Sequence, residues 1–144
     1  MNTAVIIPAF NAAHFLPDTL SSVCAQTAAP SEIMVVDDGS TDHIRDVVAA
    51  CTHARLIAQT NQGVSAARNR GAAEARSDWL LFLDADDRLT PDALKLFTAC
   101  MTDHPGFNVY YGKVVRRYSK RDGRGLSSAR GDAASEGSVP AAVR

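Results

Sequence analysis

Two aspartates with one residue between them follow an apolar run at residues 79–83, and this spacing suits a shared ligand. Side chains two positions apart on an extended chain point to the same side, so Asp84 and Asp86 can converge while Ala85 faces away. Like charges this close repel, so we expect a cation beside them. Hard divalent cations such as Mg²⁺ take carboxylate oxygens and share their remaining positions with substrate phosphates. The pair therefore predicts a cation and phosphate site, against the simpler interpretation of helix capping, which we favour for Asp87 alone.

A second apolar run, at residues 33–36 within the strand expected at 32–36, ends in another pair of carboxylates, Asp37 and Asp38. Gly39 permits a tight turn there, and the hydroxyl residues that follow can cap a helix. Capping explains those hydroxyls but not the two aspartates before them. An ionised carboxylate only accepts hydrogen bonds, so Asp38 could take the N–H of a uracil or similar base while Asp37 is structural.

Two further segments carry residues that suit a nucleotide. In residues 8–11, Pro8 withholds a backbone donor while the neighbouring backbone groups stay free to meet a base or ribose. Taken alone, that segment is read more simply as a turn. Residues 61–71 predict a loop that leads into a helix whose early turns are basic, and helix N-termini attract anions. Arg68 could reinforce a diphosphate site or lie on the surface, whereas we expect Arg70 to be a solvated surface charge.

The elements that position these residues follow from an alternation of short apolar runs and amphipathic stretches up to about residue 116. That rhythm is typical of βαβ units, so we predict an α/β, Rossmann-like fold: a mostly parallel sheet with flanking helices. Ligands of such sheets bind at the carboxyl ends of the strands, where all four segments would meet. The strand at 78–83 is expected to be buried on both faces. The expected strands span 4–7, 32–36, 55–58, 78–83 and 108–115, and helical spacing of apolar residues begins at Leu16, Ile44, Val64 and Leu94.

Bulk properties set limits on the function. With 144 residues, of which 46% are hydrophobic, the chain has room for one domain with a real core. A net charge of −1 gives no general attraction to nucleic acid or anionic membrane, so phosphate binding must be local. The apolar stretch at residues 4–7 is too short for a signal peptide or a membrane span. We expect a cytoplasmic protein and leave open a peripheral position at the inner face of the membrane.

The chain divides by composition into two parts. Residues 1–118 form the expected domain, and residues 119–144 are rich in Ser, Gly, Ala and Arg without aromatic residues, which predicts a disordered low-complexity tail. Cys24, Cys51 and Cys100 are widely spaced in helix-like apolar sequence, which favours buried reduced thiols over disulfides or zinc ligands. The histidines share no metal-ligand spacing, and the sequence contains no Walker loop or Gly-x-Ser-x-Gly elbow.

Taken together, four motifs resemble those of the family 2 glycosyltransferases: residues 6–11, 35–42, 63–71 and 82–87. The resemblance covers about residues 3–116, the nucleotide-sugar-binding half of that family's A-type fold. It implies transfer of a sugar from a nucleoside diphosphate, with UDP favoured, to an acceptor hydroxyl on a saccharide or glycoconjugate. It also implies Mg²⁺ or Mn²⁺ at the diphosphate. A nucleotidyltransferase is disfavoured, because a glycine-rich basic loop would be expected in place of residues 8–11.

Carried over by motif, the resemblance assigns binding roles to seven residues. They are Pro8, Ala9 and Phe10 at the nucleoside, Asp38 at the base, Arg68 near the nucleotide, Asp84 near the ribose and Asp86 as the main metal ligand.

The sequence departs from the family pattern where inverting members place a carboxylate as general base. No apolar strand ending in an acidic pair follows residue 115, and the carboxylates beyond it, Asp122, Asp132 and Glu136, lie in the expected tail. The catalytic base is therefore unknown. The alternatives are a nucleotide-sugar-binding protein without activity or an inactive fragment. Apolar surface exposed near the last expected strand, at Val109, Tyr110 and Tyr111, predicts self-association.

Overall fold

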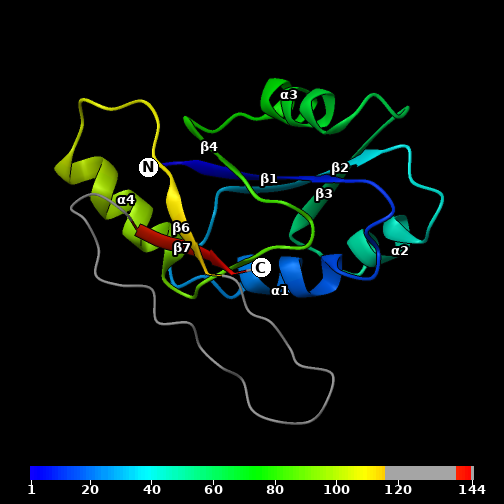
Figure 1. The fold of residues 1–144 in the computed structure, drawn as a ribbon, viewed down its shortest axis with the longest axis horizontal. Helices are drawn as coiled ribbons and strands as arrows, with labels where there is room; N and C mark the ends of the chain where they lie inside the picture. Colours follow the sequence, from blue (N-terminus) through cyan, green and yellow to red (C-terminus); the bar gives the residue numbers. More distant parts are fainter. Residues whose placement is uncertain (116–138, 144) are drawn as a thin grey trace, which may run out of the picture.

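The computed structural model describes residues 1–115 and 139–143. Its main sheet has four parallel strands in the order β3-β2-β1-β4 (Figure 1). The strands are β1 Thr3–Ala9, β2 Glu32–Asp38, β3 Ala54–Gln59 and β4 Trp79–Phe82. The parallel α/β architecture predicted from the alternating pattern is confirmed.

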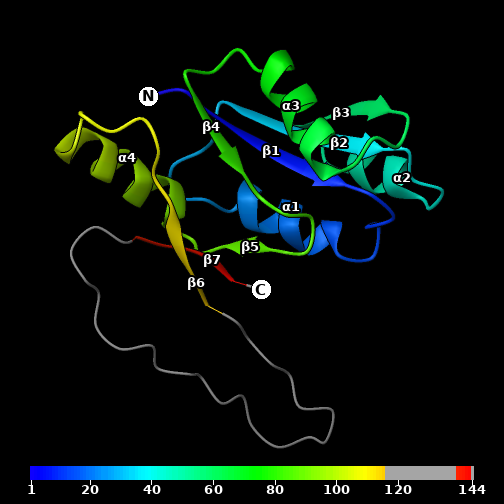
Figure 2. The same cartoon turned by 45° about the horizontal axis from the view of Figure 1, so that its top comes forward.

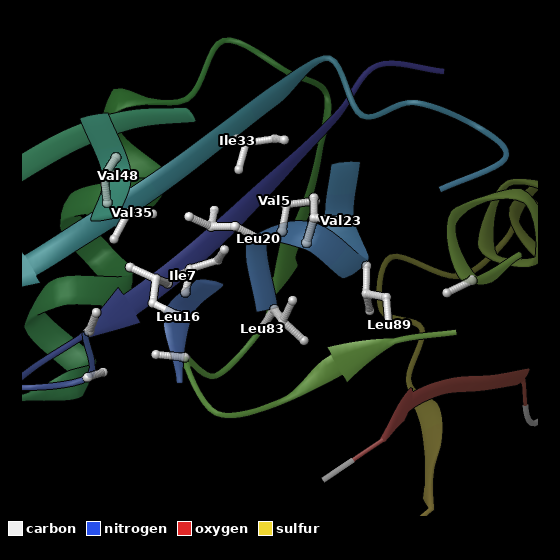
Figure 3. Close-up of a cluster of buried hydrophobic side chains, with 14 of the residues drawn as sticks. Val5, Ile7, Leu16, Leu20, Val23, Ile33, Val35, Val48, Leu83 and Leu89 are labelled. Carbon is white, nitrogen blue, oxygen red and sulfur yellow. The ribbon is translucent and has the colours of Figure 1, made fainter. Parts of the chain in front are cut away.

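Helices cover both faces of this sheet, with α1 and α2 on one side and α3 on the other (Figure 1). β1 supplies both layers: Val5 and Ile7 belong to the cluster with α1, while Ala4 and Ile6 belong to the cluster with α3. Figure 3 shows Val5 and Ile7 among the side chains of α1. The helices are α1 Leu16–Cys24, α2 Ile44–Ala49, α3 Val64–Glu74 and α4 Ala93–Asp103.

Helix α3 lies close to the sheet because its inward face carries small residues. Ala67 is fully buried, and a Cβ added to Gly71 would lie 2.4 Å from Cγ2 of Ile6 and 3.2 Å from Cγ2 of Val36. Only a residue without a side chain fits there. This close approach holds the N-terminal turns of α3 beside the carboxyl ends of β1 and β2.

The prediction that the 78–83 strand is buried on both faces is wrong. β4 is the edge of the main sheet, and Leu80 and Phe82 are 37% and 46% exposed. These two residues pair in register with Ala4 and Ile6, on the α3 face. Because α3 packs on β1 and β2, it leaves this part of β4 uncovered.

A second, three-stranded sheet has the order β5-β7-β6 and lies beside α1 and α4 (Figure 2). Its strands are β5 Arg88–Leu89, β6 Gly112–Val115 and β7 Val139–Val143. The strand expected at 108–115 is thus shorter and belongs to this sheet, not to the parallel one. Before it, Tyr110 packs edge-on against Trp79, with ring centroids 5.6 Å apart.

The expectation of disorder from residue 119 onward is wrong for residues 139–143. They form β7, which pairs parallel with β6 and antiparallel with β5, so backbone pairing on both sides supplies the order that composition did not predict. The remainder of that stretch, with Asp122, Asp132 and Glu136, lies outside the described residues.

The cysteines are free thiols, as expected, but the prediction that they are buried is wrong for Cys24. This residue ends α1 on its exposed side, while Cys51 and Cys100 are partly buried. Among residues 1–115 and 139–143, no helix has the length and apolar character needed to cross a membrane.

Candidate functional site

A cleft of about 510 Å³ opens at the carboxyl ends of β1, β2 and β4, beside the first turns of α3. All seven residues that the sequence assigned to binding line it, although they come from four separate segments. The lining residues are Pro8, Ala9, Phe10, Asn11, Ala12, Phe15, Asp38, Val64, Ala67, Arg68, Asp84, Ala85 and Asp86.

The floor of the cleft begins at the end of β1. Pro8 and Ala9 are buried, while Phe10 is 51% exposed at the rim. Asn11 has a positive φ of 50° and does not cap α1; its Oδ1 accepts the N–H of Thr41 at 2.8 Å. The N–H of Asn11 in turn donates to Oγ of Ser40 at 2.9 Å. The loop after β1 is therefore fixed to the loop after β2.

Asp37 supports the turn after β2. Its side chain is buried, and its Oδ1 accepts the N–H of Ser40 at 2.8 Å. Gly39 follows with φ +78°, and a Cβ there would lie 2.8 Å from the nitrogen of Asn61. The turn therefore requires glycine, and Asp37 does not line the cleft.

Asp38 lies at the inner wall of the cleft, and only 3% of its surface is exposed. Its Oδ1 accepts Nε2 of Gln59 and the N–H of Gln62, both at 2.8 Å, and its Oδ2 accepts the N–H of Gly63 at 2.8 Å. Burial by itself raises the pKa of Asp38, but these three hydrogen bonds together bring it below its ordinary value. The carboxylate is therefore held in its ionised form.

The same contacts show that Asp38 also caps α3. Gly63 is the N-cap residue, with φ +91°, so the carboxylate is the anion at this helix end. A carboxylate has about four acceptor positions. Three of the four accept protein donors here, which leaves about one for a ligand. The sequence analysis missed Gln59 and Gln62 as partners, and no motif marks them.

Arg68 and Asp84 form an ion pair across the cleft, with 2.6 Å between Nη2 and Oδ1. A cationic side chain thus lies beside Asp84. Both side chains are partly exposed, at 38% and 33%. The Nε of Arg68 is buried and has no hydrogen-bond partner among the described residues. Arg68 holds Asp84 through Nη2, and its partly exposed guanidinium brings positive charge to the cleft.

The loop of the second acidic pair alternates as its spacing predicts. Ala85 is buried, whereas Asp84 is half-buried and Asp86 exposed, and both carboxylates line the cleft. Two bonds fix the loop: Oγ1 of Thr19 donates to the carbonyl of Ala85 at 2.7 Å, and the N–H of Asp87 donates to the carbonyl of Asp84 at 3.0 Å. Asp87 is buried and does not line this cleft.

Arg70 points away from the site. It is exposed and pairs with Glu74 one turn later, at 3.0 Å, as expected of a surface charge. A wider hollow of about 770 Å³ runs along β4 and meets the cleft at Arg68 and Asp84. Its walls are mostly apolar and include Phe97 of α4. No motif in the sequence indicated this hollow.

The donor set can be compared with what a cation requires. Within the described part of the chain, no group of three or more His, Cys, Asp and Glu side chains could hold a metal ion alone. Asp84 and Asp86 supply two carboxylates at one cleft. Mg²⁺ is usually held by one or two carboxylates, with substrate phosphates and waters as the other ligands. The residues present fit a cation that arrives with a diphosphate.

Solved structures share this fold. The crystal structure of S. aureus TarS 1-349 in complex with UDP-GlcNAc matches with a TM-score of 0.69 and 26% identity, covering 89% of this chain and 37% of that chain. The crystal structure of the same protein in complex with UDP matches with the same TM-score and identity.

Relatives are also found by sequence. A PGL/p-HBAD biosynthesis glycosyltransferase of Mycobacterium bovis is 41% identical over 120 residues, covering 79% of this chain and 47% of that protein. An uncharacterized glycosyltransferase of Nostoc sp. is 43% identical over 100 residues, covering 66% of this chain and 31% of that protein. The chain thus spans about half the length of the mycobacterial relative and about a third of the length of the Nostoc relative. The profile of glycosyl transferase family 2 matches residues 4–138, and the chain belongs to that family.

Proposed function

We propose that this chain binds a UDP-sugar in the cleft and serves sugar transfer to a hydroxyl of a saccharide or glycoconjugate. The observation that carries the proposal is the meeting of seven residues from four motifs in one cleft. The neighbouring structures with UDP and UDP-GlcNAc support the choice of nucleotide. One relative is named for PGL/p-HBAD biosynthesis, which supports a glycoconjugate acceptor.

Each wall of the cleft has a proposed role. Pro8, Ala9 and Phe10 line the nucleoside pocket, with Phe10 exposed at the rim as an apolar surface for the base. Asp38 accepts the N–H of the base with its remaining acceptor position. A base that presents an acceptor at that point would face an ionised carboxylate, so the site favours uracil over cytosine.

The other side of the cleft carries the charged side chains that would bind the ribose, the diphosphate and the cation. Asp84 lies near the ribose, and Arg68 approaches the nucleotide with the charge of its partly exposed guanidinium. Asp86 is the exposed carboxylate of the pair and would be the main ligand of Mg²⁺ or Mn²⁺. When bound, the cation supplies Lewis-acid stabilisation of the charge on the departing diphosphate.

We propose an inverting reaction. Its transfer step needs a base that accepts the proton of the acceptor hydroxyl. Of the three carboxylates at the cleft, Asp38 is occupied by protein donors, Asp84 pairs with Arg68, and Asp86 is the proposed ligand of the cation. None of them is left to act as the base. We therefore propose that the chain alone binds the donor but transfers weakly or not at all. The specific alternative is a binding protein without activity. Under either proposal the protein is located in the cytoplasm.

Calorimetric titration with UDP, with and without Mn²⁺, tests donor binding. We expect saturable binding that requires Mn²⁺ and is lost in Asp86→Asn. Asp103→Asn removes the same charge from an exposed site at the end of α4 and should bind as wild type does. Absence of binding to UDP, GDP and TDP alike would refute the proposal. Release of UDP from UDP-GlcNAc, with and without saccharide acceptors, then separates an enzyme from a binding protein.

Self-association stays a separate proposal. Val109 and Tyr111 are each 80% exposed, close to the uncovered edge of β4. Light scattering over a range of concentrations should show mass increasing with concentration. A monomer at every concentration would refute it.

A further inference from the structure

Two cysteines that are 27 positions apart in sequence lie in contact, with their sulfur atoms 3.7 Å apart. Cys24 is the last residue of α1, which returns the chain toward the amino end of β2. Cys51 follows α2, which returns the chain toward the amino end of β3. The pair therefore lies toward the amino edge of the sheet, away from the cleft at the carboxyl edge.

The backbone holds both residues in place. The N–H of Cys51 donates to the carbonyl of Val48 at 2.9 Å, and its carbonyl accepts the N–H of Ala54 at 3.1 Å. Cys51 also packs against the main core cluster. Cys24 follows Val23, which is fully buried, and α1 packs against α2. The two thiols thus stay within reach of one another while Cys24 remains exposed to reagents.

Contact between two thiols permits either a metal site or a disulfide. A structural zinc site takes four ligands, and in the described ranges 1–115 and 139–143 no cluster of three or more His, Cys, Asp and Glu could bind a metal. An S–S bond of about 2.05 Å needs an approach of about 1.6 Å from the present separation of 3.7 Å. The disulfide is the outcome that these residues favour.

We propose that Cys24 and Cys51 are a reversible oxidation site, which forms an intramolecular disulfide and joins α1 to α2. With a low-molecular-weight disulfide such as oxidised glutathione as the oxidant, one cysteine thiolate attacks a glutathione sulfur and releases one glutathione thiolate. The second cysteine thiolate then attacks the mixed disulfide and releases the other. In balance, two cysteine thiols lose two protons and two electrons, and one glutathione disulfide becomes two thiols.

The rate of oxidation of Cys24 is limited by the fraction of its thiol that is ionised. Desolvation raises the pKa of Cys24, and the hydrogen bond and the charge of Cys51 act in the same direction. The thiolate is the attacking form, so oxidation is slow at neutral pH and is best followed at about pH 8.5.

The test uses the whole chain, treated with oxidised glutathione and examined by intact mass and peptide mapping. We expect loss of two hydrogen atoms and one cross-linked peptide pair containing Cys24 and Cys51, both reversed by dithiothreitol. The bond closes a loop between two helices, so the melting temperature should rise by on the order of 5–10 °C. Cys100→Ser is the matched control and should behave as wild type, because Cys100 lies on α4.

Cys24→Ser and Cys51→Ser should each lose the cross-link and instead carry glutathione on the remaining partner. Peptide mapping of the wild-type chain gives the answer even if a variant folds poorly. Separate glutathione adducts on Cys24 and Cys51 without a link, or a link that involves Cys100, would overturn the proposal.

Discussion

The two acidic pairs look alike in sequence, yet the structure uses them differently. Asp37 and Asp38 are the last two residues of β2, are both buried, and accept hydrogen bonds from the surrounding protein. Asp84 and Asp86 follow β4 and stay accessible in the cleft, with Arg68 as the neighbouring cation. An apolar run that ends in two carboxylates thus marks the carboxyl end of a strand, while the partners of each carboxylate decide between support and ligand binding.

Removing the buried carboxylate should have the largest effect on stability. Asp38→Ala removes the charged acceptor of three part-buried hydrogen bonds, from Gln59, Gln62 and Gly63, and a hydrogen bond to a charged group contributes roughly 1.5–3 kcal/mol. We expect the free energy of unfolding to fall by about 3–5 kcal/mol. Urea denaturation measures it. A loss below about 1 kcal/mol would mean that water replaces Asp38 easily, and the contrast between the pairs would fail.

Two arginines on one helix allow a matched test of the accessible pair. Arg68→Gln removes the partner of Asp84, whereas Arg70→Gln removes a partner of Glu74 outside the cleft. We expect Arg68→Gln to weaken UDP binding about tenfold, or about 1.4 kcal/mol, and Arg70→Gln to leave it unchanged. Because both pairs are partly exposed, each variant should lose less than about 1 kcal/mol of stability. Equal binding losses would place the effect in α3 as a whole.

The contribution of Asp38 to the free energy of unfolding should depend on pH in the acid range, an effect smaller than the loss caused by Asp38→Ala. The pKa of Asp38 is lowered in the folded chain, so its contribution is present in full above the unfolded value of about 3.9. That contribution is lost as pH falls through the folded pKa. The stability difference between wild type and Asp38→Asn should be constant above about pH 4 and shrink below it. Glu32 and Glu74, whose pKa values are also lowered, titrate in both proteins and cancel. A difference that grows on acidification would contradict this.

The sequence predicts the elements whose pattern is complete within each segment. The apolar runs at residues 4–7 and 33–36, which lie in β1 and β2, are buried on both faces in the structure. The run of β4 looks the same, but it lies at the edge because nothing in residues 79–83 reveals which strands will be neighbours. β7 was not predicted for a related reason, since it forms through backbone pairing with β5 and β6.

In the candidate site, too, some residues could be predicted from the sequence and others could not. Its seven residues follow from strand ends and motifs, because parallel strands bring their carboxyl ends to one edge. The donors to Asp38 could not be foreseen, since they depend on how residues 59–63 fold back toward β2. The exposed thiol of Cys24 was missed because helical spacing identifies the buried stripe but not the last residue beside it.

The most direct test measures stability and UDP affinity together in Asp38→Ala and Asp86→Asn. The division between the pairs predicts that Asp86→Asn stays within about 0.5 kcal/mol of wild-type stability, as exposed surface substitutions do, and loses Mn²⁺-dependent UDP binding. Asp38→Ala should instead lose several kcal/mol of stability. If Asp86→Asn bound UDP as wild type does, or unfolded as readily as Asp38→Ala, the two pairs would not differ in function and the account would be wrong.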